Sequence, residues 1–189
     1  MKNGIVTAVA AAGVLAASSA FACGFHDSVA LQKGVMNWAY PESLHVSTAV
    51  WRAQSDGLLP RDQPASDEMT AQARSALGIL RAQRVMNQLG AALQRKPGQA
   101  GRPALAVVLL GPLLWSRFET QGSAVQAQFH VEGPVTGDAV VVTELATIEA
   151  LLDGRLTLLD AQALGALRIY APVAVTAGAQ RWLSAMTAG

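Results

Sequence analysis

The stretch VVVTELATIEALLDGRLTLLDAQALGALRIYAP, residues 140–172, decides the fold. The run Ala139–Val142 is short and wholly apolar, as is typical of a buried strand. Thr143 is a candidate N-cap for a helix that Gly154 ends. The apolar residues of that helix share one face: Leu145, Ile148, Leu151 and Leu152.

A second short helix and a second strand follow in the same stretch. Thr157 and Asp160 have the spacing of a capping box, and Gly165 stands where a left-handed helix terminator is expected. Leu167–Tyr170 predicts a strand, and Pro172 is suited to the first turn of a final amphipathic helix. The apolar stripe of the final helix consists of Val175, Ala179, Trp182, Leu183 and Met186.

Three further apolar segments precede this stretch. Ala104–Leu110 is continuously apolar, which predicts a strand buried on both faces, and Leu113–Phe118 is expected to continue it after a bend at Gly111 and Pro112. Ala124–Glu132 alternates between apolar and polar residues and predicts a half-buried strand.

A long helix is predicted over Ser66–Lys96, with acidic residues in its first turn, basic residues in its last and Pro97 immediately after it. Its apolar stripe is expected to face the core: Leu77, Ile79, Leu80, Ala82, Met86, Leu89 and Leu93. The order of elements predicts an α+β domain over residues 66–189, with a small, mostly antiparallel sheet covered by helices.

The distal half of this domain resembles the sterol-carrier-protein domain: a strand, a helix ending in Leu-Leu-x-Gly, a short helix and a glycine before a strand. The matching positions are Val140–Val142, Leu151, Leu152, Gly154, Ala161, Gly165, Leu167 and Ile169. The resemblance implies an apolar tunnel between sheet and helices that takes fatty acyl chains, sterols or isoprenoid lipids such as quinones. Residues expected to line such a tunnel are Trp115, Phe118, Leu151, Trp182 and Met186.

The first 22 residues, MKNGIVTAVAAAGVLAASSAFA, have the features of a secretory signal peptide: a basic start at Lys2, a short apolar run, and small residues at a cleavage site after Ala22. The apolar run is too short for a transmembrane helix. We therefore expect a periplasmic or secreted protein, in which residues 23–65 form an N-terminal extension and linker.

Cleavage after Ala22 makes Cys23, the single cysteine, the first mature residue, and three chemistries remain open for it. Its thiolate and amine could bind copper or zinc together with His26 and His45, because these ions favour sulfur and imidazole ligands. It could instead be acylated, as in a lipoprotein anchored to a membrane, or form a disulfide with a partner protein. His45 lies in Pro41–Trp51, which fits a helix with Leu44, Thr48 and Trp51 on one side about as well as a strand.

The overall composition excludes several classes of protein. The 14 Lys and Arg residues nearly balance the 13 Asp and Glu residues, which excludes a strongly basic nucleic-acid binder. The hydrolase motifs Gly-x-Ser-x-Gly and His-Glu-x-x-His are absent from the sequence, and its glycines do not have the spacing of a phosphate-binding loop. We therefore expect a carrier for an apolar ligand, with a membrane association that is peripheral or through a lipid anchor, rather than an enzyme. The alternative is a periplasmic metal-handling or redox accessory protein that uses Cys23, His26 and His45.

Overall fold

The computed structural model describes residues 28–61, 71–95 and 102–187. The predicted signal peptide, Cys23 and His26 lie outside the described residues. The helices are α1 (Ser28–Ala39), α2 (Ser43–Ser55), α3 (Ala71–Gln94), α4 (Leu145–Leu152), α5 (Leu158–Ala163) and α6 (Val173–Thr187), and the strands are β1 (Leu105–Leu109), β2 (Leu114–Gln121), β3 (Ala124–Phe129), β4 (Ala139–Thr143) and β5 (Leu167–Tyr170). In this part of the chain, none of the helices has the length and apolar character needed to span a membrane.

The described strands form a sheet in the order β3-β2-β1-β4-β5. The central pair, β1 and β4, is parallel, whereas the β1–β2, β2–β3 and β4–β5 pairs are antiparallel. The predicted α+β class with a small, mostly antiparallel sheet covered by helices is confirmed.

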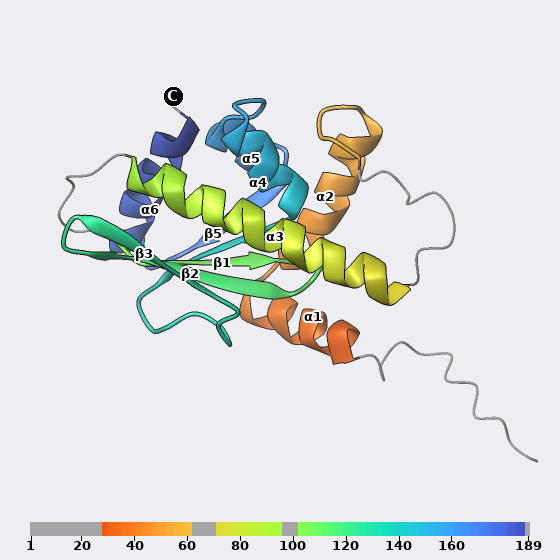
Figure 1. The fold of residues 1–189 in the computed structure, drawn as a ribbon, viewed down its shortest axis with the longest axis horizontal. Helices are drawn as coiled ribbons and strands as arrows, with labels where there is room; N and C mark the ends of the chain where they lie inside the picture. Colours follow the sequence, from red (N-terminus) through yellow and green to blue (C-terminus); the bar gives the residue numbers. More distant parts are fainter. Residues whose placement is uncertain (1–27, 62–70, 96–101, 188–189) are drawn as a thin grey trace, which may run out of the picture.

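The two faces of the sheet are covered by different helices. Figure 1 shows α3 and α4 on one side of the sheet and α1 on the other. A Cβ atom on Gly90 of α3 would lie 3.4 Å from the ring of Phe118, so the side of Phe118 is the one that α3 covers, and we call it the helical face. Trp115 points to the opposite face because successive strand residues alternate. Both central strands are buried along their whole length, as expected of strands covered on both sides.

The segment after β1 forms a hairpin, so the expectation that Leu113–Phe118 continues the first strand was wrong. The chain reverses at Gly111–Leu113, and β2 returns antiparallel with Leu114 opposite Leu109. Leu113 has a φ of 50°, which is a left-handed conformation that leucine rarely adopts. The local sequence does not indicate this conformation. The alternating strand also ends earlier than predicted, at Phe129, because His130 is left-handed with φ of 57°.

Most of the predicted helix ends in residues 140–172 are confirmed. The Thr157 side chain accepts a hydrogen bond from the Asp160 amide and Asp160 caps back, and both Gly154 and Gly165 have positive φ. The N-cap of α4 is Glu144, not Thr143. Thr143 is instead the last residue of β4, and its buried hydroxyl donates to the carbonyl of Ala166.

One prediction about a helix face was wrong, and a segment that the sequence left open is a helix. On α3, the stripe is buried from Ala82 to Leu93, but Leu77, Ile79 and Leu80 are 53%, 40% and 58% exposed. On α2, the face with Leu44, Thr48 and Trp51 is the exposed one. The buried face of α2 consists of Ser43, Val46, Val50 and Ala53. Since Val46, Val50 and Ala53 belong to the same core as the sheet, α2 packs on the domain although the sequence placed it in an N-terminal extension.

Candidate functional site

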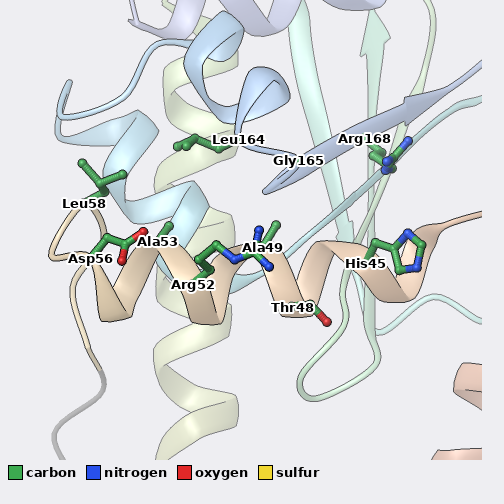
Figure 2. Close-up of a pocket in the computed structure, with 10 residues that line it drawn as sticks. All are labelled: His45, Thr48, Ala49, Arg52, Ala53, Asp56, Leu58, Leu164, Gly165 and Arg168. Carbon is green, nitrogen blue, oxygen red and sulfur yellow. The ribbon is translucent and has the colours of Figure 1, made fainter.

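A pocket of about 370 Å³ lies between α2 and the segment that joins α5 to β5 (Figure 2). Apolar side chains contribute part of its wall: Ala49, Ala53, Leu58 and Leu164. Gly165 lies above α2, and a Cβ at this position would be 3.5 Å from the Cβ of Ala49. Its φ of 74° is a conformation that glycine adopts readily, so the turn after α5 can run close to the helix.

Side-chain contacts hold α2 in place beside the pocket. The Ser47 hydroxyl donates to Glu144 at 2.7 Å, and the other carboxylate oxygen of Glu144 accepts from the amide of Gly111 at 2.9 Å. At the start of α2, the Tyr170 hydroxyl donates to the carbonyl of Pro41 at 2.6 Å. The helix that carries half of the pocket lining is therefore fixed to β5, to the β1–β2 turn and to the residue before α4.

The pocket has a charge difference between its two ends. Figure 2 shows His45 and Arg168 toward one end, Arg52 along the middle of α2, and Asp56 with Leu58 toward the other end. Arg168 forms an ion pair of 2.7 Å with Glu42, but its Nε is buried and has no hydrogen-bond partner among the described residues. Such a pocket combines cationic groups with an apolar wall.

None of the residues predicted to line a tunnel is among the residues that line this pocket. Phe118, Leu151 and Trp182 are buried in the core at 0%, 0% and 3% exposure. The Trp182 indole donates to the carbonyl of Leu93 at 3.3 Å, which joins α6 to α3. Trp115 is half-buried on the opposite face of the sheet. Met186 belongs to α6, but its side chain lies outside the described part.

Two buried hydroxyls in the core have no hydrogen-bond partner within the described residues. Ser116 Oγ belongs to β2, and because Ser116 lies two positions from Phe118 it points to the helical face. Thr147 Oγ1 belongs to α4. Both residues are 0% exposed. Buried side-chain polar groups usually have partners, so these two atoms are unusual.

The predicted metal ligands are not brought together in the described part of the chain. His45 is exposed at the first turn of α2 and lines the pocket. Across residues 28–61, 71–95 and 102–187, no three His, Cys, Asp or Glu side chains form a group that could hold a metal ion. Because Cys23 and His26 lie outside these ranges, the proposed Cys/His site stays a prediction.

An aromatic cluster covers part of the sheet face opposite α3. The ring of Tyr40 lies 6.2 Å from that of Trp115 and 5.3 Å from that of Tyr170. Burial raises the pKa of Tyr40. Burial also raises the pKa of Tyr170, although the neighbouring Arg168 acts in the opposite direction. The chain has only these 2 tyrosines, so the ionisation of the cluster can be followed directly.

We expect both tyrosines to ionise above the pH at which free tyrosine does. Since the folded state favours the neutral phenol, the stability from this cluster is complete below the unfolded pKa of about 10 and is lost as pH rises through the folded pKa. Absorbance at 295 nm, recorded with far-ultraviolet circular dichroism, measures ionisation and folding together. Ionisation near pH 10 in protein that is still folded would contradict the expected burial.

No family model matches the chain, and no curated protein matches it. Among solved structures, it is similar to a UbiJ-SCP2 ubiquinone synthesis protein, with 15% identity and a TM-score of 0.41 over 58% of this chain and 98% of the other. It is also similar to a sterol carrier protein 2, with 24% identity and a TM-score of 0.37 over 58% of this chain and 95% of the other. A third structure, from Thermus thermophilus and described as possibly a sterol carrier protein, has 24% identity and a TM-score of 0.34 over 57% of this chain and 85% of the other.

The similarity to sterol-carrier proteins that the sequence predicted is thus also found among solved structures. All three TM-scores lie below 0.5, and no ligand or activity follows from them. The proposals for this protein therefore rest on its own contacts.

The sequence alone did not indicate that two arginines line a pocket. Arg52 lies on α2 and Arg168 on β5, so only tertiary packing brings them to one cavity. A partial signal was present, because His45, Ala49, Arg52 and Asp56 have the spacing of one helix face. That signal becomes readable only after the segment is known to be a helix rather than a strand.

Proposed function

We propose that the protein is a carrier for an apolar small molecule, such as a lipid, a sterol or an isoprenoid quinone, and that it works outside the cytoplasm after its signal peptide is removed. The ligand site proposed for it is the layer between the helical face of the sheet and the helices α3, α4 and α6. The observation that carries this proposal is that two buried hydroxyls, Ser116 Oγ on β2 and Thr147 Oγ1 on α4, have no hydrogen-bond partner among the described residues.

The chemistry of these two hydroxyls fits an apolar ligand with a small polar group. Sites for small molecules are mostly apolar and contain a few polar atoms that fix orientation. A buried hydroxyl without a partner costs about 1–3 kcal/mol, and a ligand hydroxyl or carbonyl within reach would remove this cost. The apolar part of the ligand would then contact core side chains such as Phe118 and Leu151, which the sequence predicted as ligand contacts.

Entry of a ligand requires a helix to move, because this layer is closed by side chains with no exposure. Helix α3 is the best candidate, since its N-terminal half projects beyond the sheet (Figure 1) and leaves Leu77, Ile79 and Leu80 exposed. The Arg81 guanidinium binds the two Glu149 carboxylate oxygens at 2.8 and 2.7 Å and so holds α3 on α4. Movement of α3 away from α4 would break this ion pair.

Native mass spectrometry of protein purified from the periplasm of a bacterial host tests the proposal. We expect a chain that begins at Cys23 and carries an apolar molecule that organic extraction releases. A double variant, Ser116→Ala with Thr147→Val, should bind that molecule roughly 3- to 10-fold more weakly for each hydroxyl lost. Its stability should be unchanged or higher, because the substitutions remove unpartnered polar atoms.

The matched control is Thr143→Val, which removes a buried hydroxyl that does have a partner, the carbonyl of Ala166. It should lower stability by about 1 kcal/mol and leave ligand binding unchanged. Protein that neither carries an apolar molecule nor binds an added fatty acid, sterol or quinone would overturn the carrier function. A chain that still begins at Met1 and stays in the cytoplasm would overturn export, and a mature mass increased by acyl chains would show that Cys23 is lipidated.

A further inference from the structure

We propose that the pocket between α2 and the α5–β5 segment is a second binding site, separate from the interior layer, and that it binds a small organic anion: a carboxylate or phosphate attached to an apolar group. Neither of the unpartnered hydroxyls, Ser116 and Thr147, lines this pocket. An anion site in this pocket is therefore a separate proposal, and it does not depend on the carrier function proposed above.

The cationic end of the pocket has unused capacity to donate hydrogen bonds. Arg168 uses Nη2 to bind Glu42, while its Nε is buried without a partner among the described residues. The Arg52 guanidinium has no ion-pair partner within that part of the chain, although Asp56 lies one helical turn further along α2. Arginine presents several donors in a planar fork that matches the oxygens of a carboxylate or a phosphate.

Glu42 is the group with which such an anion would compete. Its side chain is 56% exposed, so it can turn away into solvent, and its exposed ion pair with Arg168 contributes little. An anion between Arg52 and Arg168 would gain contacts from two elements at once. Because one arginine belongs to α2 and the other to β5, the anion would also strengthen the docking of α2 on the sheet.

The other residues that line the pocket indicate the chemistry of the part of the ligand that carries no charge. The wall contains the apolar side chains Ala49, Ala53, Leu58 and Leu164, and about 370 Å³ is within the range of sites for small molecules. Asp56 lies toward the end opposite Arg168 (Figure 2) and repels a second negative charge there. The favoured ligand is therefore negatively charged at one end and apolar at the other.

Isothermal titration calorimetry of the mature protein with three probes tests this site: octyl phosphate, 1-octanol and inorganic phosphate. We expect octyl phosphate, used as a monomer, to bind at least 10-fold more tightly than either of the others. Arg52→Gln and Arg168→Gln should each weaken its binding about 10-fold, the effect of one lost charge-assisted hydrogen bond. Because the Arg52 side chain makes no ion pair within the described residues, Arg52→Gln should leave the unfolding temperature unchanged.

Arg155→Gln is the matched control. It removes the same charge from an exposed arginine that is paired with Asp153 and does not line the pocket, so octyl phosphate should bind as to the unchanged protein. Equal affinity for octyl phosphate and 1-octanol, or equal loss of affinity in the control, would overturn the anion site. Binding to phosphatidylglycerol vesicles without binding of soluble octyl phosphate would also overturn it. None of these outcomes bears on the interior site, which the Ser116 and Thr147 variants test.

Discussion

Replacing Asp138 with alanine should lower the free energy of unfolding by roughly 3–5 kcal/mol. The carboxylate is 3% exposed and accepts from Arg117 Nε at 2.9 Å and Nη2 at 3.2 Å. It also accepts from the backbone amide of Val135 at 2.8 Å. The hydrogen bond with Asp138 raises the pKa of Arg117, so the guanidinium stays charged and, at 15% exposure, would keep only its ion pair of 2.6 Å with Glu119. Urea denaturation followed by circular dichroism measures this loss.

Asp153→Ala provides the control for this prediction. Asp153 also binds an arginine, Arg155, at 2.8 Å, but the two side chains are 61% and 44% exposed. Solvent weakens exposed ion pairs, so this variant should lose less than about 1 kcal/mol. Arg117 belongs to β2 and Asp138 directly precedes β4, so an equally small loss in both variants would mean that this ion pair does not stabilise the packing of these two segments.

Replacing Phe118 with alanine should cost roughly 3–5 kcal/mol of unfolding free energy. The ring is fully buried under α3 next to Gly90, and it meets the ring of Phe129 edge-on with 6.4 Å between their centroids. Removing it deletes apolar contacts and leaves a cavity that the neighbouring strands and α3 can fill only partly. The same denaturation experiment measures the effect.

Phe118→Leu is the appropriate comparison, because it retains most of the apolar volume and should lose clearly less stability than the alanine variant. A loss below about 1 kcal/mol for Phe118→Ala would mean that the helical face is loosely packed at this position. Such a result would indicate a space already available to a ligand rather than a closed core, and it would change the proposed entry route through α3.

Much of the fold was predictable where the signals are local. The helices and strands of residues 139–172 were identified because capping residues, glycines with positive φ and continuous apolar runs act within a few residues. The hairpin at Gly111–Leu113 was not predictable in the same way. It depends on a left-handed leucine, which has no sequence signature comparable to glycine in a turn.

Burial was less predictable than secondary structure. Leu77 and Leu89 have the same side chain and lie in the same helix, yet Leu77 is 53% exposed and Leu89 is 0% exposed. The difference arises because α3 extends beyond the sheet that it covers, and the length of that overlap is a tertiary property. Likewise, α2 has apolar side chains on more than one side, and only the position of the sheet determines that Val46 and Val50 face inward and Trp51 outward.

The candidate site was the least predictable part. Its arginines come from α2 and β5, and the segment just before Arg52, Pro41–Trp51, fitted a helix about as well as a strand. The two core hydroxyls carry no sequence signature either, because a serine in a strand and a threonine in a helix usually find partners. Their lack of partners emerges only from the packed structure.

The parallel pairing of β1 with β4 has a consequence for the order of folding. Leu105 of β1 pairs with Ala139 of β4. In the sequence, the whole of β2 and β3 separates these two central strands. The β2–β3 hairpin is made of near neighbours in sequence and can form early, whereas the central pair must first close a long loop. We therefore expect the central pair, β1 and β4, to assemble late. The β2–β3 hairpin would form first and shorten the distance between β1 and β4.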